Sequence, residues 1–148
     1  FRGPAGGGVS DDRDLPVTWS TSENIVWKTE LPGAGRSSPI IVGNRIFLTC
    51  FSGYGLNETD PGKQEDLRRT VLCLDRASGR ILWKKQVDSK LPENAYKGYQ
   101  TQHGYASSTP AADNDRVVVF LGKTGVLAFD HDGNQEWRSE VGSGAHQW

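Results

Sequence analysis

The sequence predicts an all-β protein built from repeated four-stranded units. The 18 glycines in 148 residues exceed the average share of about 7%, which suits many tight turns. Short apolar runs end at turn residues, and one pattern of strands and turns occurs twice in the chain. No segment supports a helix, so we expect strands throughout a chain long enough to bury a sizeable core.

The charge pattern excludes several classes of function. The chain has 17 basic and 18 acidic residues and a net charge of −1, with no run of like charge, so we expect no nucleic-acid partner. No apolar run approaches the ~20 residues that span a bilayer, and Phe1 does not open a signal peptide. The chain has no methionine, which suggests a processed chain or a piece of a longer one.

The repeat comprises two copies of one unit. Residues 74–83 and 129–137 share the pattern apolar-Asp-turn-Gly-x-x-x-Trp, and residues 37–48 match residues 108–119. A third tryptophan, Trp27, stands in a segment that resembles residues 81–87. We therefore expect residues 25–31 to be the last strand of a preceding copy.

The spacing of the repeat gives the size of the unit. Trp27 lies 12 residues before Pro39, and Trp137 lies 27 residues after Pro110, so the minimal repeat is 39 residues. Blades of a β-propeller repeat at about 40–45 residues. The observed spacing between tryptophans is longer because each copy carries one insertion, at residues 52–69 and 88–105. The sequence therefore predicts part of a β-propeller, since two blades cannot close a ring of four to eight.

The strands follow from this alignment. Gly43-Asn44 is a two-residue hairpin signal, and the turns after Asp75 and Asp130 contain residues that tolerate positive φ. We expect strands at residues 38–42, 45–50, 70–74 and 81–87, and again at 109–112, 116–121, 126–130 and 135–141. The chain then divides into a lead-in arm (1–24), a strand of a preceding blade (25–31), a first blade (37–87), an insertion (88–105), a second blade (108–141) and the start of a further connection (142–148).

These residues resemble the quinoprotein-dehydrogenase-like β-propeller family of PQQ-like repeats. That family includes bacterial multi-blade proteins of unknown activity and the propeller lipoprotein of the outer-membrane assembly machine. The resemblance implies a docking motif in which a tryptophan indole wedges between adjacent blades. The positions that match this motif are Trp27, Trp83, Trp137, Gly79 and Gly133.

The resemblance also raises the alternative of an enzyme. Family enzymes hold pyrroloquinoline quinone (PQQ) and calcium in the propeller axis, often beside a vicinal disulfide. Cys50 and Cys73 are 23 residues apart and thus not vicinal, and no residues match the calcium ligands. We expect no catalytic, cofactor or metal site in this chain, and PQQ and calcium belong only to the alternative, a fragment of a quinoprotein oxidoreductase. Whether the two cysteines are bridged stays open.

A partner-binding face is the first hypothesis for function. Strands alternate in direction, so both insertions emerge on the same face of the propeller. All four tyrosines lie there, and tyrosine suits recognition. The candidate residues are Tyr54, Glu65, Arg68, Arg69, Tyr96, Tyr99, His103 and Tyr105. We expect a protein, peptide or glycan partner at this face. We also expect further blades or self-association to cover the open blade faces. The family resemblance implies a location outside the cytoplasm.

Overall fold

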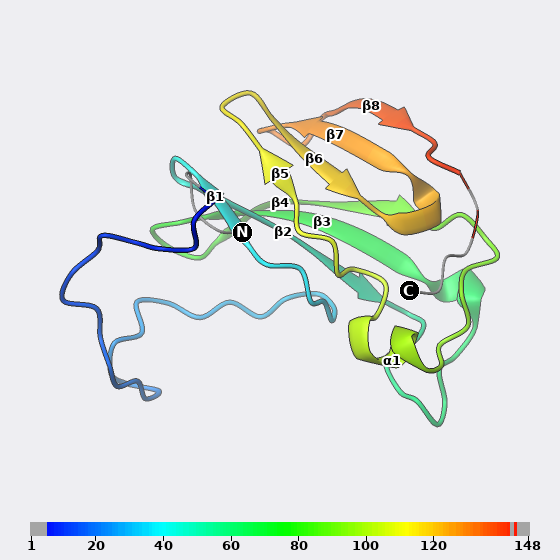
Figure 1. Cartoon of the computed structure of the whole chain (residues 1–148), viewed down its shortest axis with the longest axis horizontal. Coiled ribbons are helices and arrows are strands. Elements are labelled where there is room, and N and C mark those ends of the chain that lie inside the picture. The colour runs from blue at the N-terminus through cyan, green and yellow to red at the C-terminus, as the bar shows by residue number, and fades with distance from the viewer. Residues whose placement is uncertain (1–5, 143, 145–148) are drawn as a thin grey trace.

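Two four-stranded antiparallel sheets form the structure, which is a computed structural model describing residues 6–142 and 144 (Figure 1). The first sheet contains, in spatial order, β1 (Ile40–Val42), β2 (Arg45–Ser52), β3 (Arg68–Asp75) and β4 (Ile81–Asp88). The second contains β5 (Ala111–Ala112), β6 (Arg116–Phe120), β7 (Val126–Asp130) and β8 (Gln135–Ser139). The predicted all-β class and the two blades are confirmed.

The main core lies between the two sheets, which stack face to face (Figure 1). One face of β2 and β3 supplies Phe47, Val71 and Cys73, and all three are fully buried. Val117 and Leu127 face them from the second sheet and are also fully buried. Strand side chains alternate between faces, so the apolar residues of β6 and β7 that point into this space hold the second blade onto the first.

The turns between strands are closed by aspartate side chains. In the first blade, Asp75 Oδ1 accepts hydrogen bonds from the amide and the hydroxyl of Ser78. In the second, Asp130 Oδ1 accepts the amides of Asp132 and Asn134. The Ser78 hydroxyl bond to Asp75 and the side-chain amide bond from Asn134 to Asp130 Oδ2 are the main causes that hold the pKa of these carboxyl groups below the usual value. Such bonds are typical of local Asx turns.

A shared irregularity shows how similar the two blades are. The register shifts at Cys73/Leu74 opposite β4 and at Ala128/Phe129 opposite β8. In each case the pairing resumes at a tryptophan, with Cys73 opposite Trp83 and Ala128 opposite Trp137. A β-bulge redirects side chains, so both blades aim this tryptophan in the same way.

Two expectations from the sequence were wrong. Residues 99–103 form a short helix, α1 (Tyr99–His103), and single 3-10 turns occur at η1 (Gln64–Asp66) and η2 (Gly122–Thr124), although no helix was expected. Gly98 and Gly104 flank α1, and the segment is too short to show helical periodicity. Residues 25–31 are not a strand, because the described residues hold no neighbouring strand with which they pair.

The ends of the elements differ slightly from the prediction. β3 begins at Arg68 and β2 ends at Ser52, so the strands extend into the first expected insertion, and β8 ends at Ser139. Residues 1–5 of the lead-in arm, and most of the connection expected at 142–148, lie outside the described residues. Within the described part of the chain, no helix has the length and apolarity to cross a membrane.

Candidate functional site

Two of the three repeat tryptophans contact the glycine turn of a blade. The indole Nε1 of Trp83 donates a hydrogen bond of 2.8 Å to the carbonyl oxygen of His131, in the turn between β7 and β8. A Cβ on Gly133 would stand 2.8 Å from that indole ring, so only glycine leaves room for it. Trp83 thus reaches from the first blade onto the second.

Trp27 makes the equivalent contacts with the first blade. Its indole Nε1 donates to the carbonyl oxygen of Arg76 at 2.9 Å, and its ring occupies the space that a Cβ on Gly79 would need. Arg76 and His131 are equivalent positions, since each directly follows the turn aspartate. The contact therefore recurs with the repeat, although Trp27 lies on an extended segment and not on a strand.

Trp137 has no such contact among the described residues. Its side chain is 40% exposed on the outer face of the second blade, near the end of the chain. Phe120 is 48% exposed, and the alternation of β6 and β7 puts it on the face opposite the inter-sheet core. The second blade thus presents apolar side chains on its face away from the first blade.

The two insertions pack together into one cluster, which we call the loop module (residues 53–67 and 89–106). Its interior contains Tyr54, Leu67, Tyr105 and Ala106, which pack on Phe51 of β2, and Tyr96 packs against this cluster. The rings of Tyr54 and Tyr105 lie 5.5 Å apart, and the Tyr96 amide donates to the Tyr54 hydroxyl. The loop module, which includes α1, sits at the end of the first sheet opposite the short turns (Figure 1).

A buried ion pair connects this module to both blades. Arg69 on β3 and Glu93 are 2.9 Å apart, and their side chains are 3% and 5% exposed. The Arg69 guanidinium also donates to the carbonyl oxygen of Tyr105 and to the hydroxyls of Ser89 and Thr124. Thr124 belongs to η2 of the second blade, so one side chain joins β3, the second insertion and the second blade.

Only part of the predicted binding face is accessible. Tyr54, Tyr105 and Arg69 are at most 5% exposed, so the structure does not present these three predicted binding residues on its surface. They form the interior of the module, and burial together with the neighbouring Tyr54 hydroxyl raises the pKa of Tyr105. The alternation of β3 was the signal for Arg69, because that residue shares a face with the buried Val71.

Other predicted residues do reach the surface. Tyr99 is 57% exposed and its ring stacks on His103, with the centroids 4.0 Å apart. Glu65 is exposed, whereas Arg68, Tyr96 and His103 are partly buried. Leu56, which the sequence analysis did not single out, is 55% exposed on the same module. Apart from Arg68, which lies on β3, these side chains belong to the accessible surface of the loop module.

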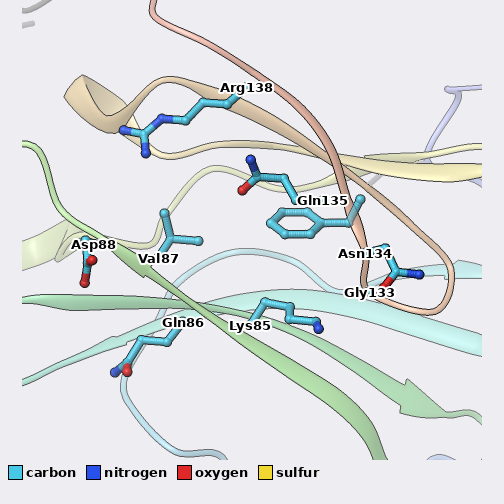
Figure 2. Close-up of a pocket in the computed structure, with 9 residues that line it drawn as sticks. Lys85, Gln86, Val87, Asp88, Gly133, Asn134, Gln135 and Arg138 are labelled. Atoms are coloured by element: carbon cyan, nitrogen blue, oxygen red, sulfur yellow. The ribbon is translucent and has the colours of Figure 1, made fainter.

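Two hollows accompany these elements. One, of about 280 Å³, lies between the loop module and residues 34–36. The other, of about 410 Å³, lies between β4 and β8: Figure 2 shows Lys85 and Asp88 on one side and Gln135 and Arg138 on the other. Since β4 and β8 are the fourth strands of successive blades, the second hollow follows from the repeat. The first depends on both insertions, which the repeat does not need, and is therefore the more specific feature.

The described residues show no cluster of three or more His, Cys, Asp or Glu that could hold a metal ion. Cys50 and Cys73 are free and buried, and they belong to separate apolar clusters. Burial raises the pKa of Cys73 to about 11, an effect that Arg45 partly offsets. A thiol with a raised pKa is mostly protonated at neutral pH, so these cysteines are typical of packed core residues.

More than half of the chain matches a known protein family. The family model described as outer membrane protein assembly factor BamB, a PQQ-repeat family, matches residues 64–147, which is more than half of the chain. The chain belongs to this family. A search of curated proteins found no match. The matched residues include β3, β4, the second insertion and the whole second blade. The family match therefore covers the same repeat that forms the two stacked sheets.

Proposed function

We propose that this chain is a non-catalytic part of a PQQ-repeat β-propeller that binds a partner through the accessible surface of the loop module. The observation that carries the proposal is the loop module itself. Two insertions that the repeat does not need are packed on a shared aromatic interior, and a buried ion pair ties the second of them to β3. Binding residues are commonly found on loops that a rigid scaffold positions.

The opposite end of the blades supports this choice of face. The turn between β1 and β2 is only Gly43-Asn44, and the Asn44 side chain donates to Asp75. The turn between β7 and β8 is closed by Asp130 and Asn134. These turns use their polar groups internally, so they offer less to a partner than the exposed side chains of the loop module.

The tryptophans support the scaffold role. We infer that Trp27 and Trp83, with Gly79 and Gly133, dock consecutive segments of the propeller onto one another, and that Trp137 does the same for a further blade. A blade buries its faces against its neighbours, which explains why Trp137 and Phe120 are exposed here. The family description names an outer membrane assembly factor, and this supports a place outside the cytoplasm.

Site-specific photocrosslinking tests the binding face. A photoreactive residue is placed at Leu56, Glu65 or Tyr99 on the loop module, and at Asn44 or Ala77 on the short turns as matched exposed controls. We expect adducts with one partner from the first set alone, formed in the native cell. Adducts formed mainly from the short turns would show that the chosen face is wrong.

The proposal also excludes a quinone site in this chain. Calorimetric titration of the chain with PQQ and calcium is expected to show no binding at micromolar concentration. A 1:1 isotherm in that range would favour the alternative, a fragment of a quinoprotein oxidoreductase, and would remove the non-catalytic part of the proposal.

A further inference from the structure

The hollow of about 280 Å³ beside the loop module is built from three separate connections. Residues 34–36 precede β1, residues 51–56 run from the end of β2 into the first insertion, and residues 96–104 belong to the second insertion. Ala34 and Phe51 exchange two backbone hydrogen bonds of 2.9 and 2.7 Å, and the Arg36 amide donates to the Ala106 carbonyl oxygen at 3.0 Å. The walls are therefore held by the backbone before any ligand arrives.

Close packing behind the hollow adds to this rigidity. A Cβ on Gly104 would meet the Phe51 ring, and a Cβ on Gly55 would stand 2.6 Å from the Tyr105 ring. Both glycines have positive φ, a conformation that other residues adopt only with strain. The backbone thus runs directly against the aromatic interior, and the hollow keeps its shape without side-chain rearrangement.

The charge of the hollow is one-sided. Its lining contains Arg36 and His103 but no aspartate or glutamate. Arg36 is exposed, and within residues 6–142 its guanidinium forms no ion pair. A guanidinium offers five N–H donors in a fork that matches a carboxylate. Arg36 is therefore ready to receive an anionic group at the hollow.

Apolar surface lies next to this charge. The Leu56 side chain is 55% exposed and lines the hollow together with the partly buried ring of Tyr96. An exposed leucine next to aromatic surface suits a small apolar group, since covering it removes apolar area from water. The hollow also falls below the ~300–1,000 Å³ of typical small-molecule sites, a size that suits one or two side chains.

From these observations we infer that the hollow binds a peptide segment of a partner protein, with a carboxylate on Arg36 and an apolar side chain against Leu56. This inference rests on the proposed function, because it names the chemistry of the partner that the loop module would bind. A peptide fits better than a glycan, since the lining combines an aliphatic side chain with a cation. His103 provides a further hydrogen-bonding group on the same wall.

The test uses the full, isotopically labelled chain and NMR titration with blocked hexapeptides. One peptide alternates Leu and Glu, and the other alternates Leu and Gln. We expect the Glu peptide to shift the amide signals of residues 34–36, 54–56 and 101–104. We expect the Gln peptide to bind at least about tenfold more weakly, because it lacks the charge-assisted bonds. Equal binding of the two peptides would overturn the inference.

Variants separate the site from general electrostatics. Arg36→Gln removes the guanidinium and keeps the backbone bond to Ala106, and Arg80→Gln removes an exposed arginine at the other end of the blade. We expect a tenfold loss for Arg36→Gln and no change for Arg80→Gln. Leu56→Ser, at an exposed position, should also weaken the binding of the Glu peptide. Equal losses from both arginine variants would refute a specific site.

Two further outcomes distinguish this inference from the proposed function. If the peptides do not bind while photocrosslinking from Leu56 and Tyr99 still yields a partner, the carboxylate site is wrong and the binding face stands. If glucuronate shifts the same amide signals with an affinity equal to that of the Glu peptide, the hollow is a glycan site and the choice of a peptide is overturned.

Discussion

Replacing Trp83 by alanine should strongly destabilise the chain. The change removes the hydrogen bond to the His131 carbonyl oxygen, worth about 0.5–1.5 kcal/mol. It also removes the aromatic contacts with Phe47 and Phe129, whose ring centroids lie 6.0 and 6.2 Å from that of Trp83, each worth about 0.5–1.5 kcal/mol beyond the buried area. With the cavity that remains, we expect a loss of about 3–5 kcal/mol.

Equilibrium unfolding in urea, followed by circular dichroism, measures this loss. Trp137→Ala is the matched control, because it removes the same side chain from the same repeat position where the ring is 40% exposed. We expect the control to lose less than half as much, since it leaves no cavity between the blades. Trp83→Phe keeps one aromatic ring, so its loss of stability measures the contribution of the hydrogen bond to His131 together with the second ring of the indole. A loss below about 1 kcal/mol for Trp83→Ala, or one equal to that of the control, would refute the docking role.

Three further changes test other parts of the structure. Gly133→Ala should cost at least 1 kcal/mol more in urea melts than Gly43→Ala: both have positive φ, but only Gly133 faces a ring, and overpacking costs about 1–3 kcal/mol. Equal costs would contradict this. Arg69→Met should destabilise by about 3–5 kcal/mol because it leaves a buried carboxylate unpaired, and should speed hydrogen exchange across residues 88–105; unchanged exchange would argue against the ion pair's role. Cys73, with its pKa raised to about 11, should be mostly thiol at pH 8, so the ultraviolet absorbance of the thiolate should stay low at pH 8 and rise as the pH approaches 11; full thiolate absorbance at pH 8 in the folded chain would disagree.

Most of the fold could be predicted because the repeat contains its own markers. The aspartate that closes each turn, the glycine after it and the tryptophan on the next strand occur at matching positions, so each copy supports the other. Hairpin chemistry at Gly43-Asn44 then located the strand ends within two or three residues. Residues 25–31 were misassigned because their local sequence around the tryptophan resembles β4. A strand also needs a neighbouring strand to pair with, and the local sequence does not show whether that neighbour is present.

The site was harder to predict, because accessibility depends on contacts between segments far apart in sequence. Strand direction placed both insertions at one end of the blades, but it says nothing about whether they pack on each other. Tyr54 and Tyr105 are 51 positions apart in the chain and nevertheless share one interior. A tyrosine that suits recognition also suits a small core, because its ring is buried while its hydroxyl finds a carbonyl, as that of Tyr105 does at Asn94.

This dual use of aromatic residues explains how the module can serve a scaffold. A loop without an apolar interior would lose much conformational entropy on binding. The buried tyrosines order the loop module during folding, so that this entropy is lost before a partner arrives. The exposed side chains of Leu56 and Tyr99 on the module, and of Arg36 beside it, are then carried on a surface that is already ordered. Preorganisation of this kind favours affinity because less freedom is lost when the partner arrives. Under the proposed function, the buried tyrosines would therefore act on binding through the shape they maintain, and the exposed side chains would act through contact.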